Sequence, residues 1–342
     1  AYPYQRQDRK AQITVTVGGL WLDLYRVQQS LVLIEKNRVL FEQLADVSQA
    51  SYSSEFSSSS GKTRQQDIIR AQIALTRLED RIDQLEQQKN SYQGQIWLWL
   101  SQFSVVNSLR GTNSVTDHPM SLHDLKLSPQ LPNIPLLQPH LVKGEQWLKE
   151  EEIVTYLVNH PAVVSMDKNI SSVKTGITLA EQSYLPEWAV NASYGYRDDD
   201  LVGHSRADLF SVGVTFDLPL FTEKRQNMAV KSAISKTEVS KTDRVLLLRK
   251  LLSAYSSNKG RLLRVNARKE RYQTILLTQI NDQAEVALSA YTHDKGDFSE
   301  VVRARIEVLN AEIDELALCI EEKKIALALN YIFIGTLAKN GA

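Results

Sequence analysis

The chain has 342 residues, of which 43% are apolar and 23% are charged, so it is long enough for two or three domains and its composition is typical of a folded protein. Its 40 basic and 40 acidic residues cancel, which argues against a partner attracted by net charge, such as nucleic acid. The single cysteine, Cys319, excludes an intramolecular disulfide framework and a cysteine-rich zinc site, and no apolar run is long enough for a membrane-spanning helix.

The first block, residues 4–118, contains no proline and carries a helical apolar repeat. Because proline interrupts helices, its absence permits very long ones. The apolar positions alternate between spacings of three and four residues, and they are Leu20, Leu24, Val27, Leu31 and Ile34, followed by Ile68, Ala71, Leu75, Leu78, Ile82 and Leu85. This period is typical of a coiled-coil seam, so we predict helices that pack against helices.

The two halves of this repeat are separated by a serine-rich stretch, Ser51–Gly61, which predicts the tip of a helical hairpin at about residues 51–66. Within it, Phe56–Thr63 (FSSSSGKT) differs from a phosphate-binding loop only by Phe56 in place of the first glycine. A phosphate-binding loop follows a strand, whereas a long helix is expected here. We therefore interpret the stretch as a helical tip and predict no nucleotide site.

The middle of the chain, residues 111–160, contains a proline-rich stretch and several potential metal ligands. These ligands are His118, His123 and His140, with Asp117 and Asp124 nearby. Their spacing is irregular and lacks a histidine pair at i and i+4 on a helix, so we predict no metal site. The charged runs Lys149–Glu152 and Glu321–Lys324 are interpreted as solvated helix surface.

Between Pro186 and Pro219 the apolar period changes to two, which predicts strands at residues 188–197 and 208–218. One face of this hairpin is large and apolar: Trp188, Val190, Tyr194, Tyr196, Phe210, Val212, Val214 and Phe216. Such strands fit the length of a lipid bilayer, but a soluble hairpin on a helical layer gives the same alternation. In lipid, an open sheet edge is forbidden, so a membrane barrel would have to be shared between copies of the chain.

The last block, residues 220–342, is again free of proline and repeats the coiled-coil period. Its seam is Val302, Ile306, Leu309, Ile313, Leu316 and Ile320. A second tip is predicted at residues 291–300, and the phrase Val301–Ile306 (VVRARI) after it matches Ile68–Ile73 (IIRAQI), 233 residues earlier. This indicates an internal duplication of the helical hairpin.

Three phrases, in this order along the chain, resemble the TolC family of outer-membrane efflux channels: Asn159–Val163 (NHPAV), Ala180–Pro186 (AEQSYLP) and Phe216–Phe221 (FDLPLF). Gln65–Gln88 also resembles the returning coiled-coil helix of that family, and Pro129–Pro139 its connection between repeats. The likeness spans nearly the whole chain.

The resemblance implies a mainly α fold: tandem long coiled-coil hairpins that form an α-barrel, with a β-hairpin contributing to a shared transmembrane β-barrel. The expected segments are a helical hairpin at 1–110, a connection at 111–160, a helix at 161–187, the outer-membrane hairpin at 188–218 and a second helical hairpin at 219–342. The family has a strand hairpin in each repeat, so the sequence resembles an N-terminally truncated member. Two strands from each of three copies make six, fewer than the roughly eight of ordinary bacterial barrels.

The implied function is a passive exit duct in the outer membrane of a Gram-negative bacterium, with a periplasmic helical domain. The implied partners are two further copies in a homotrimer, outer-membrane lipid, a periplasmic adaptor and an inner-membrane pump, with no nucleic acid and no cofactor. Small toxic compounds or metal ions are favoured as cargo. A protein-secretion duct of the same family, a periplasmic adaptor and a cytosolic coiled-coil scaffold remain alternatives, and no residue set supports an enzyme.

The second tip is the expected entrance and adaptor contact, and its four candidate residues are Tyr291, Asp294, Gly296 and Asp297. Gly296 would let the chain reverse. Asp294 and Asp297 are either a lumen-facing acidic ring, repeated by threefold symmetry, or simply turn residues.

Overall fold

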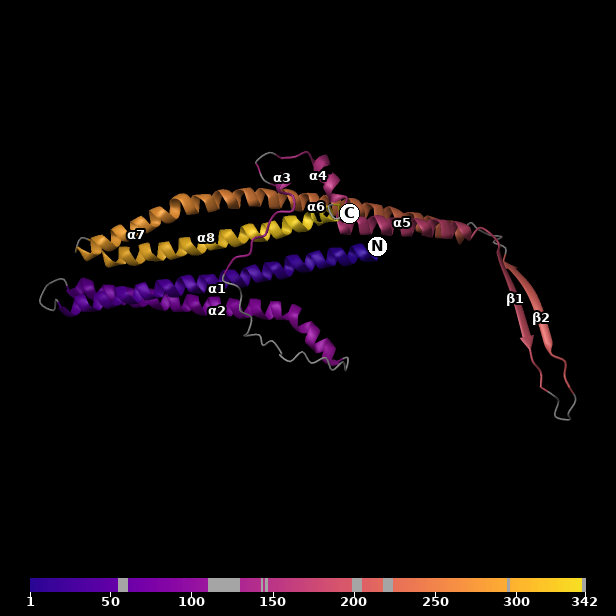
Figure 1. The fold of residues 1–342 in the computed structure, drawn as a ribbon, viewed down its shortest axis with the longest axis horizontal. Coiled ribbons are helices and arrows are strands. Elements are labelled where there is room, and N and C mark those ends of the chain that lie inside the picture. The colour runs from indigo at the N-terminus through magenta and orange to yellow at the C-terminus, as the bar shows by residue number, and fades with distance from the viewer. Residues whose placement is uncertain are drawn as a thin grey trace. The chain divides into compact units, whose positions relative to one another are not determined.

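The structure is a computed structural model of the chain, and it describes residues 1–54, 61–109, 130–142, 144, 147–198, 205–217, 224–293 and 296–339. Helices predominate in these residues (Figure 1). The first elements are α1 (Tyr2–Ser54), α2 (Gly61–Leu109), α3 (Pro139–Val142), α4 (Glu150–Leu157) and α5 (Pro161–Gln182). An antiparallel hairpin of β1 (Glu187–Gly195) and β2 (Leu209–Asp217) follows. The remaining elements are α6 (Gln226–Arg271), a π-helix (Tyr272–Leu276), α7 (Leu277–Thr292), α8 (Phe298–Ile332) and a 3₁₀ helix (Ile334–Lys339).

The chain divides into two compact units. The smaller consists of residues 1–6 and 161–250, and the larger of residues 7–160 and 251–342. Each is described by itself below.

The core of the larger unit confirms the predicted packing of helix on helix. One cluster joins α1, α2 and α8 through Ile34, Phe41, Ala71, Ala74, Leu78, Phe298, Val302 and Leu309. Another joins the start of α1 to α8 through Leu22, Tyr25 and Ile320. Leu24, Val27 and Leu309 of the predicted seams are completely buried, so the coiled-coil period selected the packed face.

The helices α7 and α8 lie side by side and pack through small residues (Figure 1). Their cluster consists of Ala284, Ala287, Val301, Ala304 and Val308. The duplicated phrases occupy matching places, because Ala71 on α2 and Ala304 on α8 are each only 2% exposed. Both halves of the proposed duplication therefore bury the same position.

The first tip begins later and ends earlier than predicted. Helix α1 continues through Ser54, although we expected the helix to stop before Ser51, and α2 already starts at Gly61. Serine costs a helix only a few tenths of a kcal/mol relative to alanine, so a serine run shortens a helix less than a proline or glycine would. The sequence FSSSSGKT begins at Phe56 in residues outside the described ones.

A polar cluster ties the start of α1 to the end of α8. The His160 ring is completely buried and its Nε2 donates to the Tyr331 carbonyl oxygen over 3.1 Å. The Tyr331 hydroxyl donates to Asp8 Oδ1 at 2.9 Å, and Gln12 Nε2 donates to Asp8 Oδ2 at 2.9 Å. Burial lowers the pKa of His160, and the charge of Asp8 partly opposes this shift.

Near this cluster, a Cβ at Gly335 would lie 2.1 Å from the Asn159 carbonyl oxygen, so this close approach requires glycine.

The segment before α4 is held onto the long helices by its main chain. Asn330 on α8 accepts from the Leu137 N–H and donates to the Pro135 carbonyl, both at 2.8 Å. The Leu141 carbonyl accepts from the Tyr255 hydroxyl on α6 at 2.6 Å. These bonds satisfy backbone groups of a segment that forms little regular structure of its own.

In the smaller unit, α5 lies against the first half of α6. Asp167 on α5 forms an ion pair with Arg244 on α6, and the Tyr184 hydroxyl donates to Asn227. The hairpin β1–β2 belongs to the same unit. No helix in the described residues is both long and apolar enough to cross a membrane.

Candidate functional site

The turn between α7 and α8 depends on Gly296. A Cβ at this position would lie 2.9 Å from the Tyr291 amide nitrogen and 3.0 Å from the Ala290 carbonyl carbon. Both are backbone atoms, which cannot move aside as a side chain can. Only glycine therefore fits where the chain comes back against the end of α7.

Asp297 is the N-cap of α8 and also links that helix to α2. Its Oδ1 accepts from the Ser299 backbone N–H at 3.0 Å and lies 3.5 Å from Arg70 Nη1. The hydrogen bonds from Ser299, assisted by the charges of Arg70 and Arg303, hold the pKa of Asp297 below its usual value. The carboxylate thus has a local structural role, and a role in an acidic ring stays a prediction. Asp294 lies outside the described residues.

Tyr291 is a packing residue of the same turn. Its ring lies edge-on to that of Phe298, with 5.4 Å between centroids, and it packs against the cluster of α1, α2 and α8 and against the cluster of α7 and α8. The described tip residues therefore have distinct tasks: Gly296 permits the turn, Asp297 caps the helix and Tyr291 fills the core beneath it.

A groove of about 400 Å³ lies between α2 and α8 just beyond this turn. Its lining includes the apolar residues Ile73, Ala74, Val302 and Ile306, and the charged residues Arg70, Arg77, Arg303 and Glu307. Ile73, and Ile69 one turn earlier, are 47% and 50% exposed. The groove thus combines an apolar floor with a basic rim, a surface suited to an amphipathic acidic segment.

We did not predict this groove, although the sequence contained a signal for it. Arg70 and Arg303 are equivalent residues of the duplicated phrases, and Arg77 follows Arg70 by one heptad. Equivalent arginines on two helices that pack together must lie near each other. The missing step was the pairing of α2 with α8.

The β-hairpin has the predicted alternation of apolar and polar residues, and its register gives it two distinct faces. Trp188 pairs with Phe216, Val190 with Val214, Ala192 with Val212 and Tyr194 with Phe210, which gathers the large side chains on one face. On the other face the Ser193 and Ser211 hydroxyls are 2.7 Å apart. There Gly213 makes room for Asn191, whose Oδ1 would be 2.7 Å from an added Cβ.

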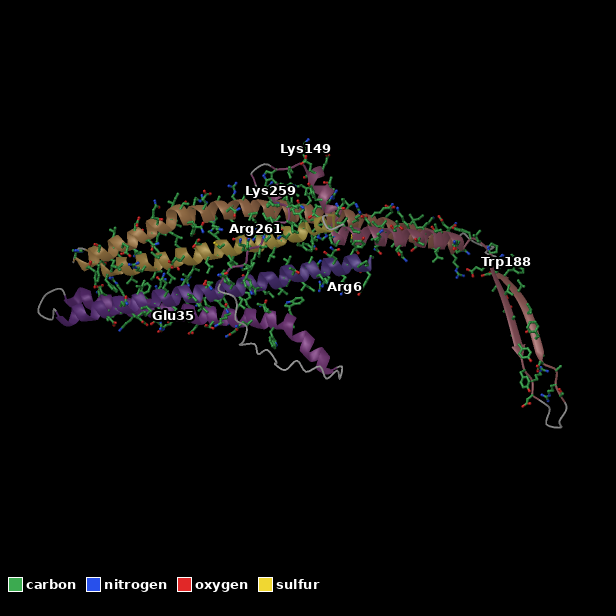
Figure 2. All side chains as sticks on the ribbon, in the orientation of Figure 1. Arg6, Glu35, Lys149, Trp188, Lys259 and Arg261 are labelled. Carbon is green, nitrogen blue, oxygen red and sulfur yellow. The ribbon has the colours of Figure 1, made fainter. Side chains whose placement is uncertain are left out.

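All the large residues of the apolar face are exposed. Their exposed fractions run from 54% for Phe216 to 74% for Val190, and the rings of Trp188 (labelled in Figure 2) and Phe216 are 5.3 Å apart. The ladder is slightly shorter than predicted, since β1 ends at Gly195 and β2 begins at Leu209 and ends at Asp217. Tyr196 lies past the ladder and is 74% exposed, and Leu218 is outside the described residues. Contiguous exposed apolar surface marks an interaction site.

The potential metal ligands of the middle segment are not brought together in the described residues. His140 is exposed and packs edge-on against Tyr156, while His118 and His123 lie outside the described part of the chain. No group of three or more His, Cys, Asp or Glu residues positioned to hold a metal occurs in that part.

Cys319 is half-buried, and burial raises the pKa of its thiol, so the side chain packs as an apolar residue.

No protein-family model matches the sequence, and no curated protein matches it significantly. Its structure, however, is similar to those of solved membrane proteins, among them an outer-membrane channel. A membrane protein from Pseudomonas aeruginosa superposes with a TM-score of 0.76 at 12% identity, covering 97% of this chain and 69% of that one. The outer membrane channel CmeC of Campylobacter jejuni gives 0.73 at 12%, covering 97% and 64%. The outer membrane protein VceC of Vibrio cholerae gives 0.73 at 13%, covering 94% and 70%.

These likenesses confirm the expected fold. Like the TolC-like outer-membrane channels, the chain has long helical hairpins and a strand hairpin, and the similar solved structures include channels and no enzyme among those named here. The chain spans 64% to 70% of the length of the three proteins above. At such low identity the similarity carries no residue roles from those proteins to this chain.

Proposed function

We propose that the chain is the channel component of an outer-membrane exit duct, which passively conducts small toxic compounds or metal ions out of the periplasm. The observation that carries this proposal is the pairing of a channel-like helical fold with a strand hairpin whose large apolar face is exposed. Water is an unfavourable environment for such a face, because each of its large side chains loses about 1.5–3 kcal/mol of transfer free energy. Lipid is the environment that suits it.

The proposal includes a homotrimer. The hairpin is a two-stranded sheet, so both of its edges carry unpaired backbone groups. Such groups are not tolerated in lipid, and they are satisfied when strands of neighbouring copies pair with them. The exposed apolar residues Ile234, Val239 and Leu246 on α6 offer a further surface for a neighbouring copy.

The proposal also places the adaptor contact at the helical tips. Support comes from the groove between α2 and α8, which lies at the tip and has an apolar floor. Its rim carries Arg70, Arg77 and Arg303, with Glu307 as the one acidic residue of the lining, and Arg70 is also paired with Asp67 and Asp297 outside it. We therefore expect the adaptor to present an acidic amphipathic helix, with energy for export supplied by the inner-membrane pump.

The test is conductance of the full-length protein in a planar bilayer, combined with site-specific cross-linking to its adaptor. We expect pores in the bilayer and a cross-link from a photoreactive group at Ile73 in the groove. A group at Arg206, in the loop between the strands, should give none. The absence of pores would contradict the channel function, while a cross-link from Arg206 alone would reverse the orientation proposed here.

A further inference from the structure

The second half of α6 carries a line of arginines that the packing of the chain does not use. Helix α6 contains twelve lysines and arginines but only three acidic residues, Glu238, Asp243 and Glu270, in a chain whose net charge is zero. Arg264, Arg268 and Arg271 follow one another at spacings of four and three residues and are all exposed. Neighbouring positions on a helix with this spacing share one face. We call these three residues the arginine ridge.

Two acidic residues of α8, Glu321 and Glu322, pair with other cations of α6 and not with the arginine ridge. Arg261, labelled in Figure 2, pairs with Glu321 at 3.1 Å, and Lys269 pairs with Glu322 at 2.7 Å. In the described residues the arginine ridge has no ion pair or hydrogen bond through its side chains. Its charge is therefore not neutralised by the part of this unit that the structure describes.

The arginine ridge lies away from the face of α6 that is packed. Leu251, Tyr255, Leu262 and Val265 form that face, and each is at most 5% exposed. With about 100° of rotation per residue, the ridge is on the order of 140° around the helix from them. It extends for roughly 10 Å along the axis.

A stable protein partner does not suit this face. Protein interfaces are anchored by aromatic and aliphatic side chains, and the described residues between Leu246 on α6 and Ile275 in the following π-helix include no exposed large apolar residue. Closely spaced guanidinium groups without such anchors suit small anions, which exchange rapidly from one to the next. The π-helix Tyr272–Leu276 follows Arg271 directly, and π-helical turns are frequent at functional sites.

We propose that the arginine ridge faces the lumen of the duct and that its cargo is anionic, consisting of small molecules with carboxylate, phosphate or sulfonate groups. The inference rests on the proposed channel function and specifies its cargo. A positive wall concentrates anions in the lumen and repels cations, so of the two cargo classes proposed above it favours small compounds over free metal ions. The effect weakens as salt increases, because exposed charges are screened.

The test measures the reversal potential of the full-length channel in a planar bilayer under a potassium chloride gradient. We expect the wild-type channel to prefer chloride. The triple variant R264Q/R268Q/R271Q should lower the chloride-to-potassium permeability ratio by roughly tenfold at low salt and by less at high salt. The matched control R264K/R268K/R271K retains the charge and should retain the ratio.

The possible outcomes distinguish a failure of this inference from a failure of the proposed channel function. If wild type and the glutamine variant conduct with the same ion preference, the arginine ridge does not face the lumen and the inference is wrong, although the channel function stands. If wild type forms no pore, the channel function fails and this inference with it. Because the three arginines are exposed and have no ion pair with any described residue, the variants should fold as wild type does, which circular dichroism checks.

Discussion

The apolar seam residues of the helical hairpins are buried or partly buried, whereas the large apolar residues of the strand hairpin are exposed. In the larger unit the coiled-coil seams are covered by other helices of the same chain, and Leu24, Val27 and Leu309 are completely buried. In the β-hairpin the apolar period is equally regular, yet Val190, Tyr194 and Phe210 are 64% to 74% exposed. Periodicity thus identifies the apolar face of each element. Only the packing shows whether that face is buried by the same chain or left for another molecule.

The largest difference in stability is expected when one aromatic ring is truncated in each region. Phe298 is 1% exposed in the core shared by α1, α2 and α8, so Phe298→Ala should cost about 3–5 kcal/mol of unfolding free energy. Phe210→Ala, at a ring that is 70% exposed, should cost little in a preparation without lipid. Denaturant unfolding followed by circular dichroism measures both. Equal losses would mean that the hairpin packs against protein after all.

The two faces of the hairpin itself provide the next contrast. In lipid vesicles, Val212→Arg or Val214→Arg should destabilise the assembled protein by about 2–4 kcal/mol if the position lies near the bilayer midplane. The controls Ser211→Arg and Thr215→Arg place the same charge on the opposite face, where the cost should be much smaller. Unfolding in urea from vesicles gives both values. A similar cost on the two faces would remove the basis for a lipid-facing assignment.

The fold was predictable because its signals are local and repeated. A period of 3.5 residues over many turns, with proline absent, specifies long packed helices whatever lies around them, and a period of two specifies which residues of each strand share a face. Contacts between elements far apart in the sequence were less predictable. The contact of α2 with α8, which creates the groove of Arg70 and Arg303, joins residues more than 200 positions apart. The role of Asp297 also required the structure, because a turn sequence does not show which backbone N–H its carboxylate meets.

A pH-dependent contrast is expected at His160. Its pKa in the folded protein lies below the ordinary value, so folding favours the neutral ring. The associated stability is fully present above the ordinary pKa of histidine and decreases as the pH falls through that value towards the folded one. His160→Gln, which retains a donor for the Tyr331 carbonyl, should reduce this dependence. Unfolding measured at neutral and mildly acidic pH tests it, and the exposed His140→Gln is the control that should behave as wild type.

A smaller effect is expected at the second tip. Asp297→Ala removes the cap of α8 and the ion pair with Arg70, and should lower stability by about 0.5–2 kcal/mol. Asp297→Asn retains a capping oxygen and should lower it less. If, however, both variants change the ion selectivity of the full-length channel equally, the charge of Asp297 contributes to the acidic ring predicted from the sequence.

The most direct test of the account is the environment of the strand residues in lipid. Spin labels placed singly at Val190, Val212 and Val214 of the full-length protein in vesicles should show strong relaxation by oxygen and little by a water-soluble nickel complex. Labels at Asn191, Ser211 and Thr215 should show the reverse, because their face is directed to water. Equal access of the nickel complex to both sets would contradict the claim that the exposed apolar face of this hairpin contacts lipid.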